Sequence, residues 1–343
     1  MTDQTLPQPV KPPPLMRVFG VLLFASAISA LFFYKWGSAF RALQKVGVTG
    51  KLGVAPEVIL EGGALVSAWH YFARIWPALT YGVVIGAIVR STVPPSWIAA
   101  VLGRRGAKPT VAGAICGSPL MLCSCCVTPI FTGVYERGAR LGSALALMLA
   151  SPGLNVAALI LTFALMPLHQ AVERALAAAI IVFALAPAIG ALLEKTVPAG
   201  KRLRAAATDE TPATWKEFAA KLAKNLVYMV GVTLPMIVVG VLLSALLLPH
   251  TTRLSALGGV FGVALVALVA TLVALPTFFE LPIALLLLGA GAPASAAIAV
   301  LVAGPIVNLP SLFVLARETN ARVAVALGAG VWVVASIAGV LAS

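Results

Sequence analysis

The chain has 343 residues, of which 61% are hydrophobic and only 10% are charged, whereas about half of a soluble domain is apolar and about a quarter is charged. This composition excludes an ordinary soluble protein and predicts a membrane protein, with room for about eight to ten spans of roughly 20 residues. The net charge of +13 lies between the apolar runs, where basic residues set orientation, so it does not indicate nucleic-acid binding.

The N-terminal region predicts a tail followed by a single helix. Residues 1–17 are polar and rich in proline, which is typical of disorder. The apolar run Val18–Tyr34 predicts the first transmembrane helix, and residues 18–73 comprise this helix and a connecting segment. The stretch "FASAISA" resembles a signal-peptidase site, but the apolar run continues beyond it, which favours an uncleaved helix.

Further apolar segments predict two transmembrane units, residues 74–193 and 226–343, joined by a basic linker, residues 194–225, that we expect in the cytoplasm. Trp215–Lys224 within this linker is a candidate for a short amphipathic helix on the membrane surface. The predicted segments are Arg74–Val93, Pro109–Tyr135, Leu141–Met166, Ala171–Leu193, Leu226–Leu248, Ala256–Leu288, Ala294–Ala316 and Ala321–Ala342.

The two units resemble each other. A shift of 153 residues aligns residues 129–161 with residues 282–314 without a gap, and ten of the 33 positions are then identical. Upstream, "WPALTYGVV" also aligns with "TLPMIVVGV". The similarity indicates an internal duplication. The chain is therefore predicted to be an all-α, polytopic membrane protein with two homologous, inverted repeats and broken or re-entrant helices.

Each unit contains two proline-marked helix breaks. The first lies in "SPLMLCSCCVTP" and "LVALPTFFELP", and the second in "ASPGLN" and "AGPIVNLP". Freed backbone groups must be buried or line a cavity, and paired interrupted segments indicate a transporter's central binding site. Ordinary proline kinks are the alternative. The expected break prolines are Pro119, Pro129, Pro152, Pro276, Pro282 and Pro305.

The basic residues predict an orientation. Most of them fall on the cytoplasmic side if Pro109–Tyr135 enters and returns on the same side as a broken hairpin. Each repeat then crosses the membrane an odd number of times, which inverts the second repeat. The residues expected inside are Arg104, Arg105, Lys108, Arg137, Arg140, Arg317, Arg322 and those of the linker; Lys35, Arg41, Lys45 and Lys51 are expected outside.

Three of the four cysteines, Cys123, Cys125 and Cys126, lie within four residues at the first break. Cysteines that are adjacent or one residue apart are poorly placed to form disulfides, but thiolates bind soft ions such as trivalent arsenic, Cu(I), Hg(II) or Zn(II). None of the histidines lies beside the cluster, so a sulfur-only site suits a thiophilic metalloid or Cu(I) better than zinc. Cysteines that serve only as small apolar side chains are the alternative. Pro119 argues against a shared helix face with Cys116.

The second unit carries different chemistry at the corresponding positions. Cys125 and Cys126 align with Phe278 and Phe279, and Val127 aligns with Glu280. Glu280 is the only acidic residue in the interior of an apolar segment, and such carboxylates are functional candidates. We expect Glu280 to couple transport to protons or to pair with a cationic cargo, unless it is a hydrogen-bonded structural residue.

Two asparagines, Asn155 and Asn308, stand at the second breaks of the two units. We expect them either to cap the half-helices that follow or to contact the cargo.

The stretch from Pro119 to Thr162, "PLMLCSCCVTPIFTGVYERGARLGSALALMLASPGLNVAALILT", resembles the ArsP/YraQ-type predicted permeases. Their hallmark is P-x-x-x-C-S-C, followed by a proline, a glycine before a small-residue helix and S-P-x-x-N. "AGPIVNLPSL" looks like the second-half counterpart. The resemblance covers most of residues 70–343 and implies a bacterial inner-membrane permease for trivalent organoarsenicals or soft metals. Cys126 departs from the family pattern, which expects a small or polar residue there. The matching positions are Pro119, Cys123, Ser124, Cys125, Pro129, Gly138, Ser151, Pro152 and Asn155.

The favoured interpretation is a secondary, proton-coupled exporter of a thiophilic species, with Cys123, Cys125 and Cys126 as cargo ligands. No Walker motif is present, so ATP drive within this chain is not expected. The prediction includes no enzymatic activity, no cofactor and no nucleic-acid partner; the partners are the lipid bilayer, a small thiophilic cargo and, where it assembles, a second copy of the chain.

Two alternatives remain open. A transmembrane thiol–disulfide carrier is expected to have cysteines in both halves; here the second half has none, although Cys116 can pair with a cluster cysteine. A transporter of a sulfur-containing anion or small thiol is the third interpretation.

Overall fold

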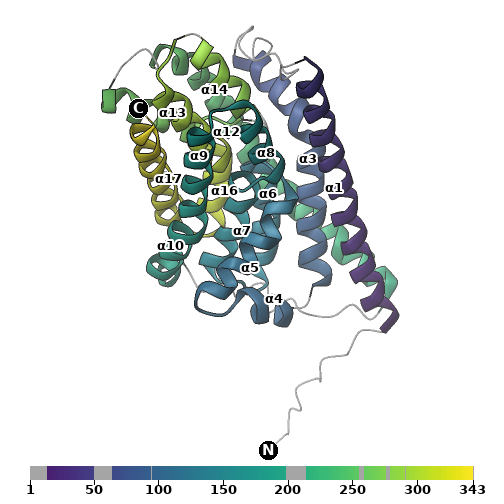
Figure 1. Ribbon diagram of the computed structural model, residues 1–343. Coiled ribbons are helices and arrows are strands. Elements are labelled where there is room, and N and C mark those ends of the chain that lie inside the picture. The colour runs from purple at the N-terminus through teal and green to yellow at the C-terminus, as the bar shows by residue number, and fades with distance from the viewer. Residues whose placement is uncertain are drawn as a thin grey trace, which may run out of the picture.

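The computed structural model describes residues 14–49, 64–93, 95–197, 214–254, 259–275, 279–289 and 291–342. These residues form helices, turns and short connections, with no strand among them, which confirms the predicted all-α membrane class (Figure 1). The helices are α1 (Pro14–Thr49), α3 (Ala64–Thr92), α4 (Pro95–Leu102), α5 (Ala107–Gly117), α6 (Ser124–Glu136), α7 (Leu141–Gly153), α8 (Val156–Leu165), α9 (Leu168–Ile180), α10 (Ala186–Leu193), α12 (Trp215–Leu254), α13 (Gly259–Leu272), α14 (Glu280–Gly289), α15 (Ala294–Ile306), α16 (Leu309–Glu318) and α17 (Ala321–Leu341).

Six helical segments in the described residues are long and apolar enough to cross a membrane, or seven if the bent pair α15–α16 counts as one span. This number is below the eight to ten that the composition allows, because four helices, α5, α6, α13 and α14, are too short to cross alone. The six segments are Val18–Arg41, Ile75–Thr92, Leu141–Leu165, Leu168–Thr196, Trp215–Leu243 and Ala321–Leu341.

The helices α5 and α6 form a hairpin that returns to the end from which it starts. A Cβ atom on Gly113 would lie 2.3 Å from the Ser143 carbonyl oxygen, and one on Gly117 would lie 2.2 Å from that of Leu147, so α5 runs parallel to α7. Near the base of the hairpin, the Arg140 backbone N–H donates to the Leu102 carbonyl (2.9 Å). This is the broken hairpin on which the predicted charge orientation depends.

The helices α13 and α14 form a second hairpin, which opens toward the opposite end of the molecule (Figure 1). The helix α13 packs along the C-terminal half of α17, where the Trp332 indole N–H donates to the Ala264 carbonyl (2.7 Å). The described tips of both hairpins therefore lie inside the bundle. The common origin of the two halves stays a prediction.

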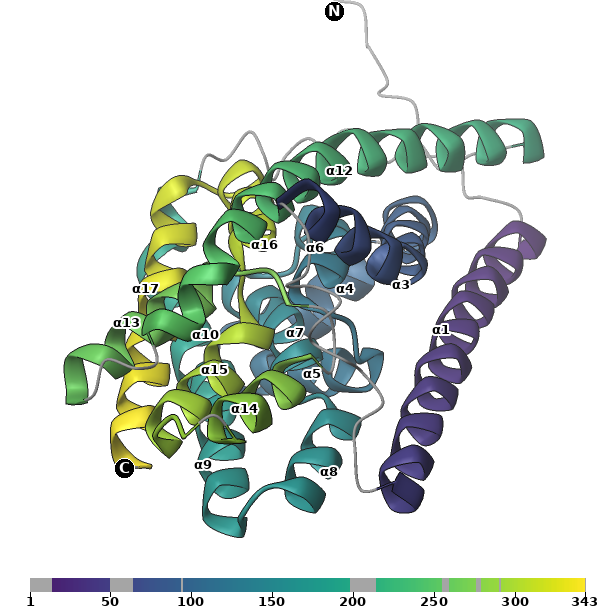
Figure 2. The same ribbon diagram turned by 90° about the horizontal axis from the view of Figure 1, so that it is seen from above.

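The centre of the bundle consists of α7 and α15, whose residues are buried from end to end except for Ala294. Viewed from above, α1 lies at the margin and α7 and α15 lie near the middle (Figure 2). Large apolar side chains on α1, such as Phe33 (75% exposed), point away from the protein, as expected for a helix in contact with lipid.

Several sequence predictions differ from the structure near the N-terminus and in the linker. Residues 14–17, expected in a disordered tail, belong to α1, while residues 1–13 lie outside the described residues. The helix α1 extends to Thr49, 15 residues beyond the end of the apolar run at Tyr34. Low hydropathy ends an apolar run but does not by itself end a helix. Trp215–Lys224 is not a separate surface helix but the first part of α12.

Five of the six predicted break prolines divide into three groups. Pro119 lies in the short 3₁₀ turn after α5, and Pro152 and Pro305 each lie one residue before the end of a helix, so these three do mark breaks. Pro282 lies in the first turn of α14, where proline is tolerated. Pro276 lies outside the described residues.

The prediction for Pro129 is wrong, because this residue lies inside α6. Proline in a helix leaves the carbonyl four residues earlier without its usual N–H donor, and that carbonyl belongs to Cys125. The Thr128 hydroxyl donates to the Cys125 carbonyl oxygen (2.5 Å), which replaces the missing hydrogen bond and lets the helix continue.

Candidate functional site

The tip of the first hairpin is a turn that places the cysteines at the start of α6. Met121 adopts a left-handed conformation (φ 49°, ψ 35°), which is uncommon for a residue with a side chain. Cys123 is the N-cap of α6, and its carbonyl accepts from the backbone N–H groups of Cys126 (3.0 Å) and Val127 (3.1 Å). The first helical turn therefore folds the three thiols onto one side.

The hairpin tip is anchored to the break between α7 and α8 by two serine hydroxyls. The Ser151 hydroxyl accepts from the Leu122 backbone N–H (3.0 Å) and lies 3.3 Å from the Leu122 carbonyl. The Ser118 hydroxyl donates to the Leu154 carbonyl (2.5 Å). These bonds satisfy backbone groups that the two breaks leave free, so both breaks of the first half form one structural unit.

The sulfur atoms of the three cysteines form a compact triangle. The Sγ–Sγ distances are 2.8 Å for Cys123–Cys126, 3.2 Å for Cys123–Cys125 and 3.8 Å for Cys125–Cys126. All three residues are at most 3% exposed. Metal–sulfur bonds of about 2.3 Å put the sulfurs of a three-coordinate ion up to about 4 Å apart. The sulfur positions are those of a candidate three-coordinate site for a soft ion, in which the shortest distance, Cys123–Cys126, would have to lengthen by about 1.2 Å.

The thiol cluster has no acidic or histidine member among the described residues. This is the sulfur-only donor set that the sequence predicts. Cys116 lies in the last turn of α5, is exposed and is not part of the cluster. Two charged residues, Lys35 in α1 and Arg174 in α9, also belong to the candidate site, and the sequence did not predict them.

Lys35 is the first of these missed residues. It was expected outside the membrane, but it lies within the apolar span of α1 and is only 7% exposed. Trp36 and Ala39 of the same helix pack with Met121 at the hairpin tip, so α1 brings the lysine near the turn that precedes Cys123. The helix continues past Tyr34 and carries Lys35 into the packed region rather than into a loop, and the side of the membrane to which Lys35 belongs stays a prediction. A lysine directly after the apolar run was the available signal.

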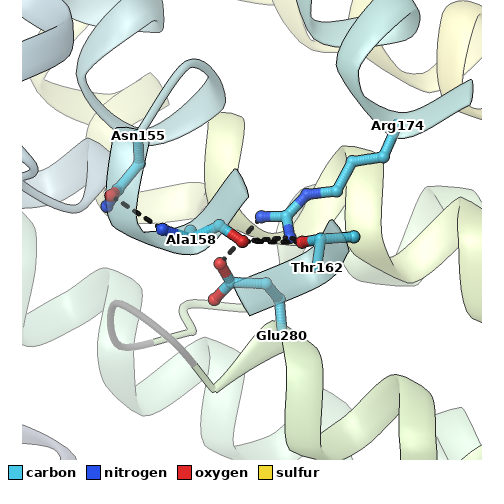
Figure 3. A network of polar contacts seen from close by, with 5 residues as sticks. All are labelled: Asn155, Ala158, Thr162, Arg174 and Glu280. Atoms are coloured by element: carbon cyan, nitrogen blue, oxygen red, sulfur yellow. Dashed lines mark hydrogen bonds and ion pairs between the residues drawn. The ribbon is translucent and has the colours of Figure 1, made fainter. Parts of the chain in front are cut away.

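Arg174 is the second missed residue, and it pairs with Glu280. Its guanidinium Nη2 lies 3.0 Å from Glu280 Oε1, and both side chains are 2% exposed. The guanidinium also donates to the Thr162 hydroxyl and to the Ala158 carbonyl (3.4 Å) (Figure 3). Arg174 belongs to α9 and Glu280 begins α14, so this pair joins the first half of the chain to the second hairpin.

Glu280 is thus not an isolated intramembrane carboxylate. Its second oxygen, Oε2, is buried and has no hydrogen-bond partner within the described part of the chain. A buried ion pair loses much of its attraction to desolvation, and removal of one partner leaves an uncompensated charge. The carboxylate is therefore held by one cation and keeps one free oxygen.

Both asparagines cap helices, as one of the two sequence interpretations predicted. Asn155 Oδ1 accepts from the Ala158 backbone N–H (3.1 Å) at the start of α8. Asn308 Oδ1 accepts from the Ser311 N–H (3.1 Å), and the Ser311 hydroxyl accepts in return from the Asn308 N–H (3.0 Å). The Asn308 amide nitrogen Nδ2 is buried without a partner among the described residues.

The structure brings these residues into two polar centres. The first contains the three thiols, with α1 and its Lys35 packed at the same hairpin tip, and the second contains Arg174 and Glu280. The second breaks of the two halves also lie side by side, since a Cβ atom on Gly153 would lie 3.2 Å from Ile306 Cγ1. Phe278, the predicted counterpart of Cys125, lies outside the described residues.

Comparison with known proteins identifies relatives of this chain. The family model described as "Predicted permease" (ArsP_1) matches residues 65–343. The chain is 27% identical over 329 residues to the UPF0718 protein YraQ of Escherichia coli K12, which covers 94% of each protein. It is 29% identical over 82 residues to the UPF0718 protein MJ0584 of Methanocaldococcus jannaschii, or 24% of this chain and 22% of that one. No solved structure matches the chain.

Proposed function

Because the chain belongs to the ArsP_1 family of predicted permeases, we propose that it exports a thiophilic species, a trivalent organoarsenical or another soft metal or metalloid, by secondary, proton-coupled alternating access. The observation that carries this proposal is the buried triangle of three thiols at the tip of a re-entrant helix. Soft thiolates select soft ions, and a transporter needs its ligands in the interior of the bundle.

Three thiols allow a bound arsenical to be released, because only two of them are needed to bind it. A methylarsenite molecule, CH₃As(OH)₂, reacts with two thiols to form two As–S bonds and release two water molecules. The third thiol of the triangle, at most 3.8 Å from the others, can then replace one bound sulfur while the proton moves to the departing one. Such exchange lets a tightly bound arsenical be handed on, and binding must permit release.

Lys35 extends the range of cargo. Two thiolates on a Cu(I) ion leave a net negative charge of one, whereas two thiolates on methylarsenic leave none. A buried ammonium on the helix that packs at the hairpin tip would offset such a negative charge, which is costly in the interior. Lys35 is therefore expected to support binding of a charged copper complex more than binding of a neutral arsenical.

The pair of Arg174 and Glu280 is the proposed coupling element. A proton on Glu280 would remove the charge that holds Arg174 and weaken the contact between α9 and α14. The pair joins the two halves, so its opening would favour their relative movement. A single carboxylate with a free oxygen can accept one proton for each transport cycle.

Uptake into everted membrane vesicles tests the proposal. The panel contains arsenite, methylarsenite, Cu(I), Zn(II) and Hg(II), with and without a pH gradient. We expect gradient-driven accumulation of at least one species by the wild type and by Cys116→Ser, whose cysteine lies outside the cluster. The Cys123→Ser/Cys125→Ser/Cys126→Ser and Glu280→Gln variants should lose it. Equal accumulation by the triple-serine variant would exclude the cluster as the cargo site.

A thiol–disulfide carrier is the second candidate, and one observation favours it. Cys123 and Cys126 form a C-x-x-C pair at a helix N-terminus with sulfurs 2.8 Å apart, which is the setting of reactive thiols. Oxidation of the pair releases two electrons and two protons to an external acceptor. Mass spectrometry of the protein alkylated in membranes distinguishes the candidates, because a carrier accumulates a Cys123–Cys126 disulfide when oxidant is supplied.

A further inference from the structure

A basic pocket lies at the base of the first hairpin and is lined by residues of α5, α7 and α10. The labels of these helices lie in the lower part of Figure 1. Its volume is about 660 Å³, which is in the range of ligand sites. Its lining carries four cations and one acid, which are Arg104, Arg105, Arg140, Lys195 and Glu194. The pocket is separate from the thiol cluster at the hairpin tip.

Most of the positive charge in this pocket is not neutralised by the protein. Glu194 forms an ion pair with Arg140 and accepts a hydrogen bond from the Leu141 backbone N–H (3.1 Å). The side chains of Arg104, Arg105 and Lys195 make no ion pair or hydrogen bond with any residue in the described ranges. Three cations therefore face the pocket without a counter-charge from those residues.

The first turn of α5 adds backbone donors to these cations. Gly106, Pro109 and Thr110 line the pocket, and Gly106 is the N-cap of α5 without a side-chain cap. The positive φ of Gly106 (112°) favours glycine, and a Cβ atom there would meet nothing within 4 Å. Pro109 has no N–H, so the free backbone donors of this turn belong to Ala107 and Lys108, and together with the positive end of the helix dipole they favour an anion.

Helices that line the pocket also carry exposed apolar side chains. The helix α5 exposes Val111 (41%) and Ile115 (67%), and α10 exposes Leu192 (76%). Trp97 on the neighbouring helix α4 is 62% exposed, as is typical of aromatic residues at the membrane boundary. A ligand with an anionic head and apolar chains matches this combination of a basic pocket and apolar flanks.

We propose that this pocket binds the phosphate headgroup of an anionic phospholipid, with the acyl chains against the exposed apolar side chains of α5 and α10. The phosphate oxygens would accept from Arg104, Arg105 and Lys195 and from the first turn of α5. Basic pockets between membrane helices bind such headgroups. The pocket is lined by α5, α7 and α10, so the bound lipid would hold the base of the hairpin in place.

Binding of short-chain phosphatidylglycerol to the purified full-length protein in a neutral detergent tests this site, with phosphatidylcholine as the zwitterionic reference. The site variant is Arg104→Gln/Arg105→Gln/Lys195→Gln. The matched control is Lys216→Gln/Lys224→Gln/Arg322→Gln, which removes three exposed cations elsewhere. We expect the site variant to bind phosphatidylglycerol more weakly by on the order of a hundredfold, since each basic residue contributes about fivefold, while the control stays near the wild type.

Three results would overturn the proposal. Equal loss in the two triple variants would mean that general surface charge, rather than the pocket, attracts the lipid. Equal affinity of the wild type for phosphatidylglycerol and phosphatidylcholine would exclude an anion site. Displacement of the lipid by millimolar inorganic phosphate would identify the site as one for free phosphate. Thermal unfolding of all proteins without added lipid confirms that the variants are folded.

Discussion

Gly82 sets the position of the helix that carries the thiols. A Cβ atom on Gly82 of α3 would lie 2.0 Å from the backbone carbonyl oxygen of Cys126. For Gly82→Ala, α3 and α6 must separate by about 1.4 Å to reach the 3.4 Å at which ordinary van der Waals contact begins. Because the obstructing atom belongs to the backbone, no side-chain rotation can relieve the contact.

The expected destabilisation of Gly82→Ala is up to about 2 kcal/mol. Overpacking costs about 1–3 kcal/mol, occasionally more, and the higher helix propensity of alanine offsets about 1 kcal/mol of this. The separation also moves the first turn of α6, so the affinity of the cluster for methylarsenite should fall. Small residues allow helices to approach each other closely in membranes. Gly82→Ala would prevent this close approach between α3 and α6.

Thermal unfolding in detergent and methylarsenite binding measure the two effects. Gly231→Ala is the matched control, because Gly231 lies in α12, is exposed and has no neighbour within 4 Å of a Cβ atom. This control should keep or raise the stability, by up to about 1 kcal/mol. If Gly82→Ala unfolds at the same temperature as Gly231→Ala and binds methylarsenite normally, the close approach of α3 to Cys126 does not position the thiols.

Three further predictions concern the buried polar groups. Arg174→Gln should reduce stability by about 3–5 kcal/mol, because it leaves the Glu280 charge uncompensated, and addition of Glu280→Gln should restore much of it; additive losses in a double-mutant cycle of thermal unfolding would contradict a direct pair. Asn308→Ala should cost about 0.5–2 kcal/mol through loss of the α16 cap, whereas Asn308→Ser should retain most of the stability, and equal unfolding temperatures for the two variants would refute this role. Lys35→Met should weaken Cu(I) binding more than methylarsenite binding in equilibrium titrations, and a parallel loss of both would show that Lys35 acts on the fold rather than on the charge of the complex.

The features that the sequence predicted correctly depend on neighbouring residues. Cys123, Cys125 and Cys126 are within four positions, so any helical turn brings their sulfurs together. Asn155 precedes a helix directly, and a side-chain cap is a local interaction with the residue three positions later. The all-α class follows from composition and from the length of the apolar runs. These predictions need no knowledge of how distant segments pack.

The features that the sequence did not predict depend on packing between distant segments. Arg174 and Glu280 are 106 positions apart, and Lys35 lies on a helix that the hydropathy pattern ended too early and that packs at the hairpin tip. Pro129 was expected to break a helix, but one neighbouring hydroxyl, that of Thr128, compensates for the missing donor. The hydropathy pattern shows that a polar side chain lies within an apolar segment, but it does not show which side chain from a distant segment forms its hydrogen bond or ion pair.

The burial of the three thiols has a kinetic consequence. With at most 3% of each cysteine exposed, a reagent in water on either side meets the sulfurs only after the protein has opened. The half-time of labelling by a small, fast thiol reagent then approaches the opening time and becomes independent of reagent concentration when capture outpaces closing. Gating rather than ligand exchange would set the turnover of such a protein, as in many enzymes whose lids limit the rate. Because Cys116 is the only other cysteine in the chain, the labelling rate of the three buried thiols would report the rate at which the protein opens.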